Sequence, residues 1–276
     1  FYTTLLHDEN TTTFDGDNTK RPKSNAINYT YDEWGNILLR YNDGDGDTTG
    51  DERFEYFDYV NNTDKWIVET TKRYSIYDSQ NVTKLRETQY SYDGLSFGAP
   101  PIRGDLTKEE KILDGGTNPV TEWEYDQFGN VVNQTDSNGR LTKLVYGIND
   151  STFTFPEQEI NAKNHITNRL YDFSTGNVLS ITDPNGFITN YTYDVFGRIL
   201  QEILPYDSPT LPTKNYTYLL DGNPPEIIKI LQREGNGTTN TLDSYQIYDG
   251  LNNVIQTKAE AENGKQIVED TYYDNL

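Results

Sequence analysis

A tyrosine-aspartate step recurs along the chain, and this repeat constrains the fold more than any other feature of the sequence. Clear copies begin at Tyr31, Tyr77, Tyr92, Tyr125, Tyr171, Tyr193, Tyr248 and Tyr273, and weaker copies begin at Phe57, Tyr146 and Tyr218. The mean spacing of about 24 residues is typical of architectures that stack one small structural unit. We therefore expect about eleven copies of one unit instead of a domain around a single core.

Each copy is expected to form two strands and two turns. Tyr191 and Tyr193 lie two residues apart, so they share one face of a strand. Asp194 begins an Asp-Val-Phe-Gly turn, in which the aspartate caps the backbone and Gly197 takes a positive φ. A second turn, Asp-Pro-Asn-Gly at residues 183–186, reverses the chain again. The pattern predicts an antiparallel hairpin.

A lone hairpin is marginally stable in water, so successive hairpins must pair edge to edge. About twenty strands in one sheet accumulate twist. We therefore predict an all-β fold, a continuous antiparallel sheet of tyrosine-aspartate hairpins that spirals into part of a β-shell or tube. The residues that define the repeat are the tyrosine, aspartate and glycine of its best copies: Tyr31, Asp32, Gly35, Tyr125, Asp126, Gly129, Tyr193, Asp194, Gly197, Tyr248 and Asp249.

The sequence divides into three regions. Residues 1–93 are expected to form repeat-like strands with an acidic hairpin, and residues 120–276 the regular repeats. Residues 94–119 are rich in Gly and Pro and are expected to form an inserted loop, in which residues 106–113 are a short polar helix candidate. The chain has no Met and its last repeat stops before a turn glycine, so we expect one continuous architecture that is a fragment of a larger protein.

Composition excludes several classes of protein. The chain has 44 acidic and 23 basic residues, and its net charge of −21 repels nucleic acids and anionic membrane surfaces. No segment approaches the roughly 20 apolar residues of a membrane-spanning helix, so no membrane insertion is expected. The 22 Tyr, 11 Phe and 3 Trp residues provide the bulky surface that disordered chains lack.

The repeat resembles that of the RHS or YD-repeat family, which includes toxin-complex shell components, polymorphic RHS toxins and the teneurins. The resemblance is clearest at residues 125–131, 183–198 and 248–256, while residues 61–68 and 90–94 are similar to the stretch that precedes the repeats in toxin-complex members. The resemblance implies a spiralled β-sheet that forms the wall of a hollow shell. In several members the shell encloses a segment released by autoproteolysis, but nothing here matches the region that carries the cleavage aspartate.

We therefore expect a non-enzymatic structural wall segment of a large secreted or cell-surface RHS protein that encapsulates or displays another part of the polypeptide. Its partners are then the remainder of that polypeptide or its cargo, or further copies through self-assembly. No catalytic residues are predicted, because the acidic residues recur at turn positions where capping explains them. Two alternatives remain: a teneurin-like adhesion or recognition module, and a subunit of an extracellular filament or surface layer.

A calcium site is a minority hypothesis, and no other cofactor is expected. Asp43, Asp45 and Asp47 stand at alternate positions, and their oxygen ligands suit a hard cation. Thr48 and Phe54 replace the glycine and the bidentate glutamate of an EF-hand loop, so a solvated hairpin tip is the favoured interpretation.

Glycosylation sequons are more frequent than composition alone predicts. Three of them precede the same Tyr-Thr-Tyr sequence and should lie on the strand face opposite the tyrosines, although Asn and Thr also suit polar strands and turns. We predict glycans on an extracellular protein at Asn10, Asn28, Asn61, Asn81, Asn133, Asn149, Asn190, Asn215 and Asn236.

Overall fold

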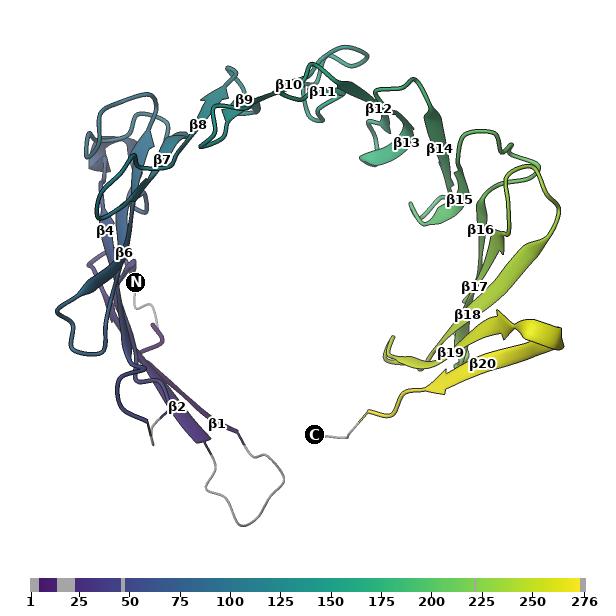
Figure 1. Cartoon of the computed structure of the whole chain (residues 1–276), viewed down its shortest axis with the longest axis horizontal. Helices are drawn as coiled ribbons and strands as arrows, with labels where there is room; N and C mark the ends of the chain where they lie inside the picture. The colour runs from purple at the N-terminus through teal and green to yellow at the C-terminus, as the bar shows by residue number, and fades with distance from the viewer. Residues whose placement is uncertain (1–4, 14–22, 46–47, 221, 274–276) are drawn as a thin grey trace. The chain divides into compact units, whose positions relative to one another are not determined.

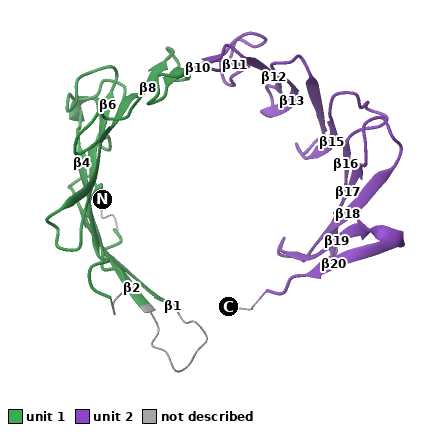
Figure 2. Ribbon diagram, viewed as in Figure 1, with its two compact units in different colours: residues 1–143 green, residues 144–276 purple. Residues whose placement is uncertain are grey.

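The structure is a computed structural model that describes residues 5–13, 23–45, 48–220 and 222–273 (Figure 1). Within these residues, two short 3₁₀ helices, η1 (Thr63–Lys65) and η2 (Glu262–Gly264), accompany twenty strands of one sheet. The predicted all-β fold is confirmed. No helix within these residues has the length and apolar character needed to span a membrane. The chain divides into two compact units, residues 1–143 and 144–276 (Figure 2).

The first unit contains the strands β1 (Asp8–Thr13), β2 (Lys23–Tyr31), β3 (Ile37–Asn42), β4 (Arg53–Tyr59), β5 (Thr71–Tyr77), β6 (Lys84–Tyr92), β7 (Leu106–Ile112), β8 (Val120–Tyr125) and β9 (Val131–Thr135). Strand β10 (Leu141–Val145) includes the boundary between the units. The second unit contains β11 (Gln158–Ile160), β12 (Ile166–Asp172), β13 (Asn177–Thr182), β14 (Ile188–Tyr193), β15 (Ile199–Ile203), β16 (Lys214–Leu219), β17 (Glu226–Arg233), β18 (Thr241–Tyr248), β19 (Val254–Ala261) and β20 (Lys265–Asp270).

Strands pair with their neighbours in the sequence, and the pairs are antiparallel. In the first unit Tyr29 lies opposite Arg40, and in the second Lys229 lies opposite Tyr245. At β10 and β11 the backbone N–H of Glu157 donates to the carbonyl of Val145 at 2.9 Å. The sheet is therefore a succession of hairpins, as the tyrosine-aspartate spacing predicts.

Residues 94–119 are not a loop throughout, because they contain β7, which pairs with β6 and β8. The helix candidate at residues 106–113 is also wrong, since residues 106–112 form that strand. An isolated polar helix of about eight residues is unstable in water. As a strand, the same residues satisfy the backbone groups that β6 would otherwise leave unpaired.

Register shifts mark the tyrosines of the repeat. The described strand pairs contain eight shifts, and each falls at the step just before a tyrosine. At each shift the extra residue belongs to the following strand, as Leu200 does opposite Tyr193, and a β-bulge bends the strand that carries it. The tyrosines concerned are Tyr31, Tyr59, Tyr77, Tyr92, Tyr125, Tyr171, Tyr193 and Tyr248.

Tyrosine hydroxyls at or just beyond the ends of even-numbered strands donate to backbone carbonyls at or near the beginning of the preceding strand. Tyr193, for example, donates to Val178 at 2.9 Å, and Tyr125 donates to Leu106 at 2.8 Å. The tyrosines bonded in this way are Tyr31, Tyr59, Tyr92, Tyr125, Tyr171, Tyr193, Tyr218 and Tyr273. Tyr248 differs, because its hydroxyl donates to the side chain of Gln246 at 2.9 Å.

Among the described residues of each unit no second layer covers either face of the sheet, and the buried apolar side chains are Ile203 and Pro101. The accessible surface is 18,323 Å². A compact monomer of 31.7 kDa exposes about 12,000 Å². Half-buried rings and hydrogen bonds therefore replace a hydrophobic core.

Polar groups fill several of the most buried positions. Glu87 accepts hydrogen bonds from Lys84 Nζ at 2.5 Å and Gln89 Nε2 at 2.7 Å. Tyr74 donates to Glu55 at 2.8 Å, and burial together with this carboxylate raises the pKa of Tyr74 to about 12. The contacts of Glu87 lie within β6, whereas the bond from Tyr74 to Glu55 joins β5 to β4 and adds to the sheet's own hydrogen bonds.

The substitution Tyr193→Phe tests the contribution of one hydroxyl. It removes the bond to Val178 while keeping the ring, so we expect a loss of about 0.5–1.5 kcal/mol, measured as a lower urea midpoint. Tyr206→Phe is the matched control, because Tyr206 is exposed. Equal shifts in the two variants would contradict a structural role of the hydroxyl.

Candidate functional site

Connections that follow the even-numbered strands gather at one end of the sheet in each unit, which we call the tyrosine end. Some are tight turns that begin with the repeat aspartate, as at residues 32–36, 126–130, 194–198 and 249–253. Others are longer, as at residues 60–70, 93–105 and 146–157. This end carries the features that distinguish one repeat from another.

The aspartate builds each tight turn with its carboxylate. At residues 249–253, Asp249 Oδ1 accepts the backbone N–H groups of Leu251 at 2.8 Å and Asn253 at 2.9 Å. The same two bonds, at 2.8 to 3.0 Å, recur in the turns that begin at Asp32, Asp126, Asp136, Asp183 and Asp194. The fourth residue is left-handed, which favours glycine, as at Gly35, Gly129 and Gly197. In the turn of Asp249, Asn252 takes this place with φ 66°.

These bonds favour the ionised carboxylate. At Asp249 the side-chain amide of Asn253, followed by its backbone N–H, lowers the pKa below the ordinary 3.8. At Asp183 the backbone N–H of Phe187 lowers the pKa most. Asn161 forms the same turn without a charge, since its Oδ1 accepts from the backbone N–H of His165 at 3.1 Å.

In the first unit, the turn at residues 32–36 has neighbours on both sides. The rings of Trp34 and Trp66 meet edge to face at 5.4 Å, and Asn36 Nδ2 donates to the carbonyl of Val68 at 2.6 Å. On the other side of the turn, the side chain of Leu5 lies 3.7 Å from the position that a Cβ atom on Gly35 would occupy. The longer connection at residues 60–70 is therefore packed against the turn.

The connection at residues 93–105 is held closed by Asp93. Its carboxylate accepts four backbone N–H groups at 2.6 to 3.2 Å, those of Ile102, Arg103, Gly104 and Asp105. Burial opposes ionisation, but these four donors lower the pKa of Asp93. The side chain of Arg103 reaches towards the next tight turn, where its Nη2 lies 3.6 Å from the point at which a side chain on Gly129 would begin.

In the second unit, connections cover turns in a similar way. The ring of Phe155 stacks on Tyr171 at 5.0 Å and lies against Gly176, in the turn after β12. Pro224 lies 3.1 Å from the point where a side chain on Gly250 would begin.

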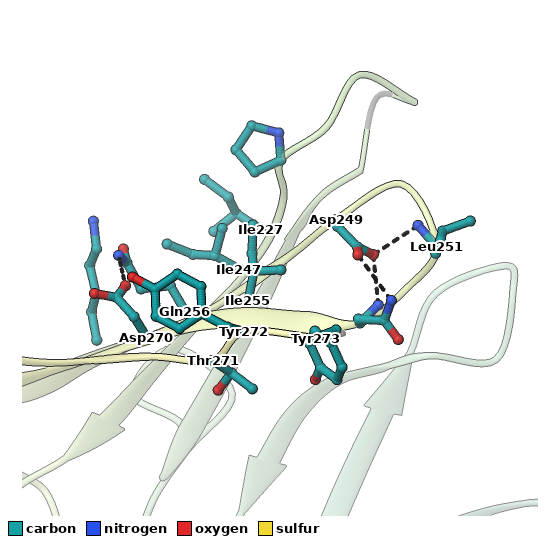
Figure 3. A pocket seen from close by; sticks show the side chains of 13 residues that line it. Ile227, Ile247, Asp249, Leu251, Ile255, Gln256, Asp270, Thr271, Tyr272 and Tyr273 are labelled. Carbon is teal, nitrogen blue, oxygen red and sulfur yellow. Dashed lines mark hydrogen bonds between the residues drawn. The ribbon is translucent and has the colours of Figure 1, made fainter. Parts of the chain in front are cut away.

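Beyond Gly250 lies an open groove of about 790 Å³ (Figure 3). Its apolar lining comes from Ile227 of β17, Ile247 of β18 and Ile255 of β19. Ile227 and Ile247 are direct cross-strand partners. Ile255 is the extra residue of the bulge at Ile247/Tyr248, because Ile247 pairs with Gln256 and Tyr248 pairs with Val254. Three adjacent strands thus supply one apolar surface.

Aromatic and polar side chains border the groove. Tyr272 is 90% exposed and Leu251 is 84% exposed, while Tyr273 is anchored by its hydroxyl bond to the carbonyl of Val254 at 3.1 Å. Gln256 Nε2 donates to Asp270 Oδ1 at 2.6 Å (Figure 3). Lys258 also lines the groove, so an apolar floor is bordered by charged side chains.

Sequence reasoning assigned Asp249, Tyr273 and the stretch 248–256 to the repeat and predicted no groove there. One signal was available at residues 271–273, where the sequence Thr-Tyr-Tyr replaces Tyr-x-Tyr. Tyr272 thereby stands at the position whose side chain faces away from the repeat tyrosines. The apolar row itself depends on the bulge at Ile255, which strand periodicity does not reveal.

The nine sequon asparagines fall into two groups. Five are in strands: Asn10, Asn28, Asn133, Asn190 and Asn215. The register places these five on the face opposite the repeat tyrosines, which we call the asparagine face. The other four lie outside the strands: Asn61, Asn81, Asn149 and Asn236. Asn10, Asn81, Asn149, Asn190 and Asn236 are exposed, and the remaining four are half-buried.

Of the three aspartates of the predicted calcium site, Asp43 and Asp45 are described, and each takes part in a hydrogen bond with another part of the chain. Asp43 Oδ1 accepts the N–H of Ala26 at 2.5 Å, and the N–H of Asp45 donates to Asp51 Oδ2 at 2.8 Å. Asp47 lies outside the described residues. Within those residues, no group of three or more acidic or histidine side chains is placed to hold a metal ion. Calcium binding here stays a prediction.

The chain is similar to known proteins in sequence and in fold. The family model described as RHS Repeat matches residues 171–208. The tRNA nuclease WapA of Bacillus subtilis (strain 168) is 30% identical over 145 residues, which are 52% of this chain and 6% of that protein. The chain therefore spans a small part of this relative.

Two solved structures share the fold. The crystal structure of TcdB2-TccC3 matches with a TM-score of 0.65 and 14% identity over 92% of this chain and 20% of that chain. The crystal structure of TcdB2-TccC3 without its hypervariable C-terminal region matches with a TM-score of 0.63 and 12% identity over 92% and 22%. Here too the chain spans about a fifth of its counterpart.

The substitution Asp249→Asn tests the charge of a turn. A group whose pKa is lowered by folding stabilises the fold above its ordinary pKa, and this contribution is lost as the pH falls through the lowered value. We therefore expect the variant to have a lower urea midpoint at pH 7, with a deficit that shrinks below about pH 4. Asn161→Asp is the reverse control and should gain the pH dependence. A deficit that does not change with pH would contradict the role of the charge.

Proposed function

Because this chain is an RHS-repeat protein, we propose that it is a non-enzymatic structural wall segment of a large secreted or cell-surface RHS polypeptide. The wall would encapsulate or display another part of the polypeptide. Its partners are then the rest of that polypeptide or its cargo.

One observation carries this proposal: among the described residues of each unit, neither face of the sheet is covered by a second layer. Residues that would form the core of a globular protein remain half-exposed, and the surface exceeds that of a compact monomer by about half. Such a sheet suits a wall, because both faces are available to contact other material.

The size of the similar proteins supports a larger polypeptide. The chain corresponds to 20% of the matching TcdB2-TccC3 chain and 6% of WapA. The name of WapA describes a tRNA nuclease, but the matching 145 residues are a small part of it. We propose that this segment contributes structure and that any enzymatic activity belongs to other parts of such a polypeptide.

The repeat aspartates favour a structural role over a catalytic one. Their carboxylates accept two or more hydrogen bonds from their own turns, which holds the backbone and lowers the pKa. A general acid near neutral pH needs a raised pKa instead.

An extracellular location with N-linked glycans is part of the proposal. The five strand-borne sequons share the asparagine face, and glycans there would leave the bonded tyrosines of the other face undisturbed. A net charge of −21 also favours solubility at an outer surface.

A filament or surface-layer subunit is the second candidate, because β1 and β20 each pair on one side only among the described strands. The side chains of both strands are exposed throughout. An unpaired edge is a template for another strand.

The mass of the native polypeptide tests the wall proposal. Under denaturing conditions, we expect a polypeptide several times heavier than the 31.7 kDa of this chain, because a wall segment needs further chain to enclose or display. The measurement is intact mass spectrometry of the protein from its natural source. A mass near 31.7 kDa, combined with polymers in sedimentation velocity, would favour the filament instead.

Enzymatic removal of N-linked glycans tests the location. We expect the native protein to lose mass, and Asn190→Gln to lose one glycan because Asn190 is exposed on the asparagine face. Asn185→Gln is the matched control, since Asn185 is exposed in a turn but does not begin a sequon. A native mass that the treatment leaves unchanged would refute the glycans.

A further inference from the structure

We infer that the groove beside the turn at residues 249–253 is a docking site for an aromatic side chain carried by the connection of another RHS hairpin. The inference rests on the wall function proposed above, and it names a contact by which such a segment joins neighbouring repeats.

The tight turns at the tyrosine end carry large apolar side chains at a position where the backbone does not require them, whereas the turns at Asp136 and Asp183 carry Asn138 and Asn185 there. The turn needs an aspartate at its first position and a left-handed residue at its fourth, whereas the third position is free to be polar. At the tyrosine end this third position nevertheless holds Trp34, Phe128, Phe196 and Leu251. Repeated exposure of large apolar residues at one end of a sheet is typical of a contact surface.

The structure contains completed examples of such a contact. Trp34 is met by Trp66, which lies on the connection that follows it in the sequence, and Leu5 lies on the other side of the same turn. In the second unit, Phe155 stacks on Tyr171 and lies against Gly176. At these two places an aromatic residue of a neighbouring connection thus packs against the tyrosine end.

The turn at residues 249–253 has a neighbour on one side. Pro224 and Pro225 lie on the β17 side, where Pro224 contacts Gly250. The groove extends from Pro225 and Ile227 across to Tyr272 beyond β20, and within the described residues Leu251 and Tyr272 remain 84% and 90% exposed there. The groove therefore adjoins a turn whose apolar side chain has no aromatic neighbour of the kind that Trp66 gives Trp34 among the described residues.

The lining of the groove determines the chemistry of its occupant. Ile227, Ile247 and Ile255 provide an apolar floor, and Tyr272 provides a ring that can stack at its rim (Figure 3). The amide of Gln256 is already bonded to Asp270. An aromatic ring buries a large apolar area with two rotatable bonds, so it fits such a site better than a charged side chain.

Residues 60–70 of this chain are the best available probe, because they cover a tight turn from the corresponding side through Trp66. We would titrate a fluorescein-labelled synthetic peptide of these residues with the whole 276-residue chain and follow fluorescence anisotropy. We expect saturable binding in the submillimolar range, weakened about tenfold or more by Leu251→Ser. A peptide with Trp66→Ser should bind as weakly.

Two controls make the outcome decisive. Val195→Ser removes an apolar side chain that is 94% exposed at a different turn of the same end, and it should bind like the unaltered chain. Tyr272→Ser gives a second groove variant that leaves the strands untouched, and it should weaken binding. No saturable binding up to millimolar peptide, or equal binding by all variants, would overturn the inference. A short native polypeptide would refute the wall function without changing these binding results, so the two failures are distinguishable.

Discussion

The bond from a tyrosine hydroxyl to a carbonyl of the preceding strand holds together a sheet that lacks a core. A hydrogen bond of this kind contributes little by itself, but it recurs at eight tyrosines, each at or just beyond the end of an even-numbered strand. The ring covers the backbone of the neighbouring strand while the hydroxyl anchors it. Tyrosine is suited to this task because it combines a large apolar body with a polar tip.

The bulge, the turn and the tyrosine form one structural device. The bulge lies opposite the tyrosine on the following strand, and the aspartate that follows the tyrosine closes the turn with its carboxylate, as at Tyr193 and Asp194. Because this device fixes the backbone locally, the remaining turn positions are free to vary. The molecule uses that freedom at the tyrosine end, where long connections and apolar turn residues make contacts that differ from repeat to repeat.

Much of the fold could be predicted from the spacing of tyrosines and turn residues. Tyr191 and Tyr193 indicated a strand with one tyrosine face, and Asp194 with Gly197 indicated a turn, because both patterns depend on local backbone geometry. The bulges and the carbonyl partners of the hydroxyls were not predictable, since they depend on register. The strand at residues 106–112 was missed because its polar side chains favour neither a helix nor a strand until β6 offers its edge.

The groove was beyond sequence reasoning for a similar reason. Ile227, Ile247 and Ile255 come from three strands, and Ile255 reaches the groove because of a bulge. A period of two along β19 would place it on the opposite face. The sequence does show Thr271-Tyr272-Tyr273 in place of the repeat's Tyr-x-Tyr. This change puts an aromatic ring on the side away from the repeat tyrosines.

Pairing between strands that adjoin in the sequence has a consequence for how such a chain is made. Each hairpin finds its partners among residues already synthesised or about to follow, so no strand must wait for a distant segment. Folding can then proceed from one end as the polypeptide emerges from a ribosome or an export channel. A sheet assembled in this order lengthens one hairpin at a time, and no completed hairpin has to open for the next one to pair.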